Sequence, residues 1–140
     1  MIDDIPSSRT VMIVEDNTDL CLLLSTILKI QGIKTTTACG GEEAWAKLQS
    51  GDLPDLIVTD LRMPGMNGAV FIDKLQHDAR TRDIPVILST AHPEIFSQAQ
   101  QMGVQGYLAK PYSMANVISL MNTFMPALDS TPIATTPAHL

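Results

Sequence analysis

The sequence is poor in cysteine, lacks a cluster of basic residues and contains no long hydrophobic run. Its two cysteines, Cys21 and Cys39, provide neither a disulfide framework nor a metal-binding spacing, so we expect both thiols to be free and buried. The nine Lys and Arg residues are scattered along the chain, and the formal net charge is −6. Because an acidic protein repels the nucleic-acid backbone, we do not expect direct binding to DNA or RNA.

The sequence also lacks signals for export or membrane insertion. Residues 1–9 carry two aspartates, where a signal peptide would have a basic start followed by an apolar run. The longest apolar stretch, residues 20–30, contains polar residues and Lys29 and is too short to cross a bilayer. We therefore expect a cytoplasmic protein that does not enter the membrane.

The length and composition of the chain fit one folded domain. A chain of 140 residues holds one domain of ordinary size, and a hydrophobic content of 45% suffices for a core and excludes global disorder. We expect an N-terminal extension over residues 1–9 and the folded domain over residues 10–126. Residues 127–140 are rich in Pro, Thr, Ser and Ala without periodicity, which is typical of a flexible tail or linker.

Strand-like segments alternate with helix-like segments along the chain. Runs rich in apolar or β-branched residues predict strands at residues 10–14, 33–38, 56–59, 84–88 and 106–109. A helical pattern follows each of them, first from a cap at Asn17 or Thr18 to Gly32, then over residues 42–48, 69–76, 94–102 and 113–125. Five such units in a row predict an α/β fold in which helices cover both faces of a parallel sheet.

The spacing of apolar residues also predicts which helical side chains face the core. In the first helix these are Leu20, Leu23, Leu24, Ile27 and Leu28. In the helix over residues 69–76 they are Val70, Phe71 and Leu75.

Polar side chains follow four of the predicted strands, at the edge of the sheet where the carboxyl ends meet. Glu15 and Asp16 follow the first strand, Asp60 follows the third, Thr90 the fourth and Lys110 the fifth. Binding sites of parallel α/β sheets form at this edge. Each residue alone is typical of a helix cap or a solvated loop. Together they predict one site that contains three carboxylates, a hydroxyl and an ammonium group.

These groups indicate phosphoryl chemistry assisted by a cation. Three clustered carboxylates bind protons more tightly unless a cation neutralises them, and oxygen ligands suit a hard cation such as Mg²⁺, with Mn²⁺ as an alternative. Beside that cation, Asp60 is a candidate nucleophile that forms an acyl phosphate. Lys110 would stabilise the phosphoryl oxygens as a point charge, and the Thr90 hydroxyl would bind a further oxygen.

Four motifs in order resemble those of response regulator receiver domains: VMIVEDN at residues 11–17, IVTDLRMPGMNG at 57–68, STA at 89–91 and GYLAKPY at 106–112. The resemblance covers residues 10–125 and implies a doubly wound, flavodoxin-like sheet with the strand order 2-1-3-4-5. It also implies that Asp60 is the phosphoacceptor, that Glu15, Asp16 and Asp60 bind the metal, and that Thr90 and Lys110 complete the site. By the same resemblance, Tyr107 is an aromatic switch, the Arg62 backbone carbonyl is a metal ligand, and the Lys110–Pro111 peptide is cis.

The resemblance further implies a role in two-component signalling. The partner would be a sensor histidine kinase or a histidine phosphotransfer protein that supplies the phosphoryl group. Phosphorylation would switch the face formed by residues 94–102, 106–109 and 113–125, which would control an output domain, a partner protein or a homodimer. On this interpretation the chain promotes its own phosphorylation and dephosphorylation and is not a turnover enzyme on an external substrate.

Three other functions deserve comparison. A flavodoxin-like FMN binder needs a phosphate loop rich in Ser, Thr and Gly after the first strand, whereas Glu15-Asp16-Asn17 has the wrong charge. A phosphatase of the haloacid-dehalogenase type needs a D-x-D-x-T signature after that strand, which is absent. A pseudo-receiver that binds partners without phosphorylation is the strongest alternative, although the complete set of site residues argues against it.

A few positions depart from the family pattern or flank its site. Tyr112 stands where Phe is usual, and the acidic pair is Glu-Asp where Asp-Asp is also common, so that Glu15 would reach the metal through water. Arg62 and His92 each lie two residues beyond a site residue, and we expect them to control access of the hydrolytic water. The predicted switch face is almost without charge and rich in methionine, with Met114, Met121 and Met125.

Overall fold

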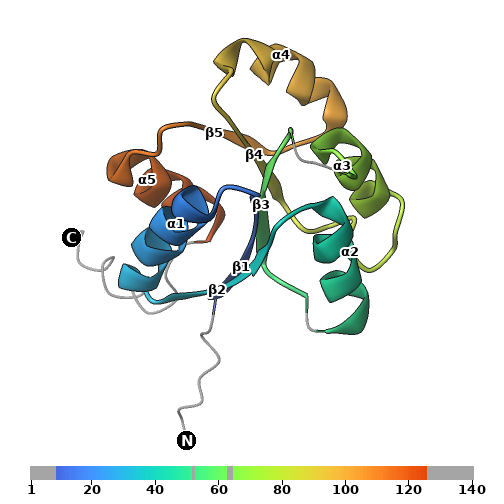
Figure 1. The fold of residues 1–140 in the computed structure, drawn as a ribbon, viewed down its shortest axis with the longest axis horizontal. Coiled ribbons are helices and arrows are strands. Elements are labelled where there is room, and N and C mark those ends of the chain that lie inside the picture. The colour runs from blue at the N-terminus through green and yellow to red at the C-terminus, as the bar shows by residue number, and fades with distance from the viewer. Residues whose placement is uncertain (1–8, 52, 63–64, 126–140) are drawn as a thin grey trace, which may run out of the picture.

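Five parallel strands form one sheet in the order β2-β1-β3-β4-β5 (Figure 1). The computed structural model describes residues 9–51, 53–62 and 65–125. The predicted extension and tail therefore lie almost wholly outside the described residues. The strands are β1 (Arg9–Val14), β2 (Ile33–Ala38), β3 (Leu56–Asp60), β4 (Val86–Thr90) and β5 (Gly106–Ala109). The predicted α/β class, doubly wound sheet and strand order are confirmed.

Helices cover both faces of the sheet, as the sequence predicts. The helices are α1 (Thr18–Ile30), α2 (Gly41–Ser50), α3 (Gly68–Gln76), α4 (Phe96–Ala99) and α5 (Met114–Phe124). Figure 1 shows α1 and α5 together on one side of the strands and α2 and α3 on the other. None of the helices within the described ranges has the length and apolar character to cross a membrane.

The core consists of two apolar layers separated by the sheet. Alternate residues of β1, β3 and β4 point to opposite faces, so that Ile13 and Val58 pack with α1 and α5, whereas Met12 and Ile57 pack with α2 and α3. All five residues of β3 and of β4 are buried. Burial on both faces explains why these strands are apolar without alternation.

Two predicted elements differ from those observed. The strand predicted at residues 84–88 is β4 at Val86–Thr90, because the Ile84 N–H donates to Thr81 O and holds residue 84 in a turn. The helix predicted over residues 94–102 is divided into a 3₁₀ turn (η2, Pro93–Ile95), the single turn α4 and a second 3₁₀ turn (η3, Gln100–Met102). Among its side chains of described burial, Ala99 alone is fully buried, so packing contributes little to a regular helix here.

Three predictions about burial were wrong. Leu23 is 42% exposed and Val70 is 46% exposed. Leu23 lies about 100° from Leu24 around the helix, at the margin of the buried stripe. Cys39 is exposed because it follows the last residue of the edge strand β2, and Cys21 on α1 is only partly buried. Both thiols are free, as predicted.

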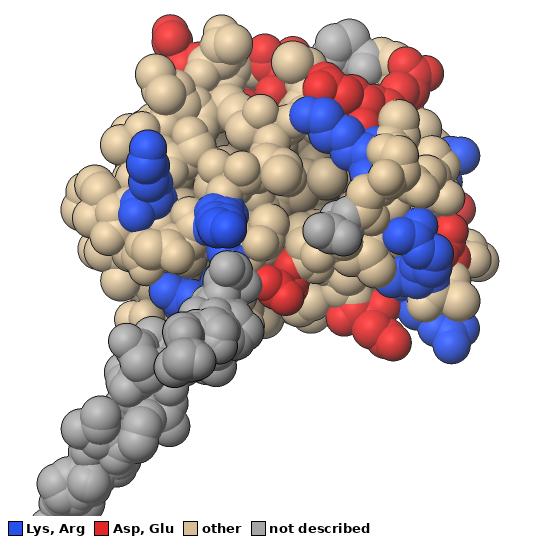
Figure 2. All heavy atoms as spheres, turned by 90° about the horizontal axis from the view of Figure 1, so that it is seen from below, with Lys and Arg blue, Asp and Glu red and all other residues tan. Residues whose placement is uncertain are grey.

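Charged side chains of both signs are mixed on the face of the molecule that Figure 2 shows. Figure 2 shows Lys and Arg as separate spots with Asp and Glu between them. This view agrees with the scatter of basic residues along the sequence and shows no continuous basic surface on this face.

Candidate functional site

Glu15, Asp16 and Asp60 converge at the carboxyl edge of the sheet. Val14 pairs with Thr59, which brings Glu15, just after β1, level with Asp60, the last residue of β3. Glu15, Asp16 and Asp60 each offer a carboxylate oxygen, and these three atoms lie within 4.8 Å of one another. Glu15 and Asp60 are buried and Asp16 is exposed. The structure thus brings together the three carboxylates that the sequence places at this edge.

The turn after β1 holds the acidic pair in place. The Glu15 N–H donates to Ala38 O and continues the pairing of β1 with β2. The Glu15 Oε2 atom accepts from the Asn17 N–H at 3.1 Å. The Asn17 side chain in turn accepts from the Leu20 N–H and caps α1, as one of the two predicted caps. The end of β2 therefore fixes the backbone of Glu15, and the start of α1 fixes one of its carboxylate oxygens.

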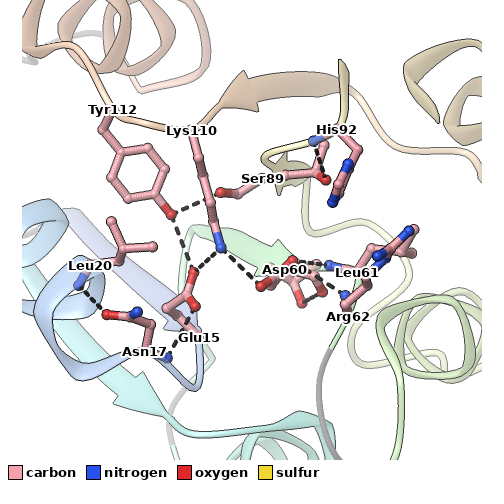
Figure 3. A network of polar contacts seen from close by, with 12 residues as sticks. Glu15, Asn17, Leu20, Asp60, Leu61, Arg62, Ser89, His92, Lys110 and Tyr112 are labelled. Atoms are coloured by element: carbon pink, nitrogen blue, oxygen red, sulfur yellow. Dashed lines mark hydrogen bonds and ion pairs between the residues drawn. The ribbon is translucent and has the colours of Figure 1, made fainter. Parts of the chain in front are cut away.

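The turn after β3 orients Asp60. Its Oδ1 atom accepts from the Leu61 N–H at 2.7 Å and from the Arg62 N–H at 3.3 Å (Figure 3). The turn closes where the Gly68 N–H donates to Leu61 O. A Cβ atom at Gly68 would overlap Asp60 O and lie 2.7 Å from Leu61 Cα, so only glycine fits this contact.

Lys110 connects the two buried carboxylates. Its Nζ atom lies 2.7 Å from Glu15 Oε1 and 2.9 Å from Asp60 Oδ2 (Figure 3). Burial lowers the pKa of Lys110, but the hydrogen bonds to Glu15 and Asp60 outweigh burial and leave the pKa above its usual value. The peptide bond between Lys110 and Pro111 is cis, as the resemblance implies.

The charges of the site are suited to a divalent cation. Three carboxylates face one ammonium group, so the cluster keeps a net charge of about −2 when all groups are ionised. All three acidic ligands offer oxygen, the donor that Mg²⁺ prefers in proteins. The residues present therefore fit a hard divalent cation in both charge and donor type.

Thr90 and its neighbour His92 lie at the end of β4. The Thr90 side chain is buried, and its Oγ1 atom accepts from the His92 N–H at 3.0 Å, which leaves the hydroxyl proton for another acceptor. The His92 ring is half-exposed, with Nδ1 3.6 Å from a Glu94 carboxylate oxygen. The Arg62 side chain is exposed. Arg62 and His92 are both drawn around the same edge of the sheet in Figure 3.

Tyr107 lies on β5, beside the short helix α4. Its ring stacks on Phe96 with a centroid separation of 4.6 Å and an interplanar angle of 26°. The side chain is only partly buried. The structure therefore places Tyr107 between the sheet and the solvent, supported by an aromatic residue of α4.

Tyr112 and Ser89 were not predicted to have a role in the site. The Tyr112 hydroxyl lies 2.8 Å from Ser89 Oγ and donates to Glu15 Oε1 at 3.4 Å. Burial of this hydroxyl raises the pKa of Tyr112 to about 12. The signal in the sequence was the tyrosine that replaces the usual Phe, since a buried tyrosine requires a partner for its hydroxyl. That partner is Ser89, and finding it required knowing where β4 places Ser89 relative to the segment after β5.

Comparison with known proteins gives a consistent result. The sequence model described as "Response regulator receiver domain" matches residues 11–122. The chain is 33% identical over 110 residues to the chemotaxis protein CheY-3 of Vibrio cholerae, which covers 76% of this chain and 84% of that protein. It is 32% identical over 127 residues to the phosphate regulon transcriptional regulatory protein PhoB of Rhizobium meliloti, with 86% of this chain and 56% of PhoB covered.

The chain is much shorter than some of the proteins it resembles. The DNA-binding transcriptional regulator NtrC of Salmonella typhimurium is 33% identical over 113 residues, or 79% of this chain. The chain spans 24% of the length of NtrC and 56% of that of PhoB. The similarity to these regulators therefore concerns one part of each of them.

Solved structures share the fold. The chemotaxis protein CheY4 of Vibrio cholerae superposes with a TM-score of 0.77 at 26% identity, covering 84% of this chain and 99% of that chain. The receiver domain of the sensor histidine kinase PA1611 of Pseudomonas aeruginosa gives a TM-score of 0.77 at 24% identity, covering 84% and 97%. The latter structure is described with a magnesium ion coordinated in its active site cleft.

Proposed function

The chain belongs to the response regulator receiver domain family, and from this premise we propose that Asp60 accepts a phosphoryl group in a Mg²⁺-dependent reaction. The observation that carries the proposal is the arrangement around Asp60. The carboxylate stands at the end of β3, within 4.8 Å of two further acidic ligands and 2.9 Å from the Lys110 ammonium group. This set supplies a nucleophile, a cation site and a positive charge for the transferred group.

The proposed metal ligands are Glu15, Asp16, Asp60 and the backbone carbonyl of Arg62, with Glu15 bound through water. When bound, Mg²⁺ (or Mn²⁺) would neutralise the carboxylates and the charge of the incoming phosphoryl group. The magnesium-containing relative and the acidic cluster of this chain support this assignment.

The chain's own residues carry out the proposed transfer. A carboxylate oxygen of Asp60 attacks the phosphorus of a phosphohistidine, the P–N bond breaks, and an acyl phosphate forms on Asp60. Two backbone N–H groups already hold Asp60 Oδ1, so the carboxylate is oriented before the donor arrives. Lys110 then exchanges its contact with Asp60 Oδ2 for a phosphoryl oxygen, and the Thr90 hydroxyl donates to another oxygen.

The proposed output is a change of the surface formed by α4, β5 and α5. Donation by Thr90 to the phosphoryl group would rearrange the end of β4, and Tyr107 would turn inward from its stack on Phe96. A partner that binds this form more tightly than the resting form would shift the population toward it. We propose that a sensor histidine kinase or histidine phosphotransfer protein supplies the phosphoryl group in the cytoplasm. An output domain or partner protein would read the result, and the chain would not turn over an external substrate.

Binding of beryllofluoride, a mimic of the phosphoryl group, tests the proposal. We expect beryllofluoride with Mg²⁺ to shift the amide resonances around Asp60, Thr90 and Lys110, and acetyl phosphate to add one phosphoryl group. Asp60→Asn should abolish both effects while the protein stays folded. The control is Asp55→Asn at the other end of the same strand, where Asp55 Oδ2 accepts from the Thr10 N–H.

The result separates an active receiver from a pseudo-receiver. A wild-type chain that binds neither Mg²⁺ nor beryllofluoride would act only as an interaction module. Labelling of Asp60→Asn at the wild-type rate would instead show that another residue is the acceptor.

A further inference from the structure

A buried row of hydroxyl groups ends on the Glu15 carboxylate. Ser89 Oγ lies 2.8 Å from Tyr112 Oη, and Tyr112 Oη lies 3.4 Å from Glu15 Oε1 (Figure 3). The relative exposures are 1% for Ser89, 9% for Tyr112 and 3% for Glu15. The row joins β4, the segment after β5 and the end of β1, on the side of the sheet that α1 and α5 cover.

The direction of these hydrogen bonds follows from the chemistry of the end group. An ionised carboxylate only accepts, so the Tyr112 hydroxyl must donate its proton to Glu15. The remaining role of Tyr112 Oη toward Ser89 is that of acceptor, so Ser89 donates to Tyr112. Ser89 therefore donates to Tyr112, and Tyr112 donates to Glu15. Ser89 orients the Tyr112 hydroxyl, which in turn orients the Glu15 carboxylate.

Packing alone does not account for the Tyr112 hydroxyl. The ring lies in the apolar layer with Val117 and Met121, where a phenylalanine ring would fill the same space. Burying a hydroxyl without partners is destabilising, so its presence requires the contacts to Ser89 and Glu15. These contacts connect the tyrosine to a residue of the site and not merely to the core.

The Glu15 carboxylate is held from three directions. Oε1 accepts from Lys110 and Tyr112, and Oε2 accepts from the Asn17 N–H. Lys110 also donates to Asp60, and in the proposed mechanism it exchanges this contact for one with the phosphoryl group. Tyr112 is the side-chain donor to Oε1 that takes no part in this exchange. Its hydroxyl therefore provides a hydrogen bond to this buried oxygen that does not depend on Asp60.

We propose that Tyr112, oriented by Ser89, is a positioning residue that fixes Glu15 toward the bound Mg²⁺. The inference rests on the proposed function, because the orientation of Glu15 matters only if the cluster binds the cation. Residues that hydrogen-bond to metal ligands commonly change metal affinity by about 10- to 100-fold when they are removed. Because a hydrogen bond of 3.4 Å is long, the effect of Tyr112 belongs at the lower end of this range.

Magnesium titration of four proteins tests the assignment: the wild type, Tyr112→Phe, Ser89→Ala and the double variant. Mg²⁺ alone is the probe, and amide chemical shifts give the dissociation constant and show that each variant is folded. We expect Tyr112→Phe to weaken Mg²⁺ binding about tenfold and Ser89→Ala to weaken it less. Because Ser89 acts through Tyr112, Ser89→Ala should add nothing in the Tyr112→Phe background.

A matched control separates positioning from loss of stability. Thr81 is also a buried hydroxyl residue, which donates to Leu75 O at the opposite edge of the sheet. Thr81→Val should lower the unfolding temperature but leave the Mg²⁺ dissociation constant unchanged.

The outcomes distinguish this inference from the proposed function. A wild type without Mg²⁺ affinity would overturn both. If the wild type binds Mg²⁺ and Tyr112→Phe binds it equally well, the inference alone is wrong. If Ser89→Ala weakened Mg²⁺ binding equally in the wild type and in the Tyr112→Phe background, Ser89 would act independently of Tyr112. The inference that Ser89 orients Tyr112 would then be wrong.

Discussion

At the scale of single residues, Lys110 determines the charge balance of the site. One ammonium group lies within hydrogen-bonding distance of both Glu15 and Asp60, so each carboxylate has a counter-charge before any cation binds. Removal of only one member of a buried ion pair leaves an uncompensated charge, which is strongly destabilising. The pairs therefore compensate both buried carboxylates in the absence of a metal, while Asp16 is exposed.

Arg62 and His92 offer a prediction about the lifetime of the acyl phosphate. The Arg62 N–H donates to Asp60, and the His92 N–H donates to Thr90 at the end of the neighbouring strand β4. Bulky or hydrogen-bonding groups at such positions block or orient the hydrolytic water. We expect Arg62→Ala and His92→Ala to change the dephosphorylation rate by about two- to tenfold, measured by decay of the phosphorylated protein in Mg²⁺.

Matched controls for this prediction lie at the other edge of the sheet. Arg82 and His77 are exposed and stand between α3 and β4, near the amino ends of the strands. Arg82→Ala and His77→Ala should leave the rate unchanged. Equal rates for the wild type, Arg62→Ala and His92→Ala would assign both flanking residues to the surface without a role in hydrolysis.

Individual residues also show where sequence reasoning reached its limit. Asp60 and Lys110 could be placed because each directly follows a strand, and strand ends converge at one edge. The Ser89–Tyr112 contact could not, because it depends on which face of β4 carries Ser89 and on the path of the chain after β5. The exposure of Leu23 depends on its angular position around α1, and that of Cys39 on the residue at which β2 ends.

At the scale of elements, the turn between β3 and α3 connects Asp60 to the rest of the fold. Gly68 begins α3, is buried, and lies directly against the backbone of Asp60 and Leu61. Asn67 caps the helix by accepting from the Val70 N–H at 3.0 Å. A change in the position of this helix start therefore displaces the backbone that presents Asp60.

Gly68→Ala is predicted to disturb both stability and the site. The added Cβ would overlap Asp60 O, so the backbone must move, at a cost of about 1–3 kcal/mol in the free energy of unfolding. Mg²⁺ binding should weaken as well, which denaturant unfolding and metal titration would measure. Gly51→Ala is the control, because its Cβ would meet only Lys47 O at an ordinary 3.5 Å. Equal stability of Gly68→Ala and Gly51→Ala would contradict the tight contact.

The elements differ in how well the sequence determines them. Long apolar strands and capped helices such as α1 were placed to within about two residues, because pattern, cap and burial agree. The helix predicted over residues 94–102 is instead two 3₁₀ turns around α4. It has few buried side chains and no side-chain cap at α4, so local geometry depends on contacts such as Gln76 to Met102 O.

At the scale of the whole molecule, the fold was predictable because the separate signals agree. Five apolar strands alternating with amphipathic helices permit few arrangements other than a doubly wound sheet, and the polar residues at the strand ends all fall on one edge. The burial of side chains on the face proposed to switch was less predictable. Of the three methionines assigned to the switch face, Met121 and Met125 are buried and Met114 is 52% exposed.

The surface of α4, β5 and α5 has almost no charge. Between residues 93 and 125 the charged residues are Glu94 and Lys110, and Lys110 is occupied in the site. A dimer held by salt bridges across this face therefore lacks the residues to form them. Apolar contacts through Met114 and neighbouring neutral side chains are the remaining source of affinity.

We therefore predict that beryllofluoride induces self-association that is insensitive to salt. Sedimentation with Mg²⁺ and beryllofluoride should give similar dimer affinity from about 0.1 M to about 1 M salt, although the Debye length falls from about 10 Å to about 3 Å. Met114→Ser should weaken the dimer severalfold, whereas Leu22→Ser, an exposed apolar position on α1, should not. A steep loss of affinity with rising salt would show that charge pairing drives association. A chain that stays monomeric in beryllofluoride would exclude the homodimer.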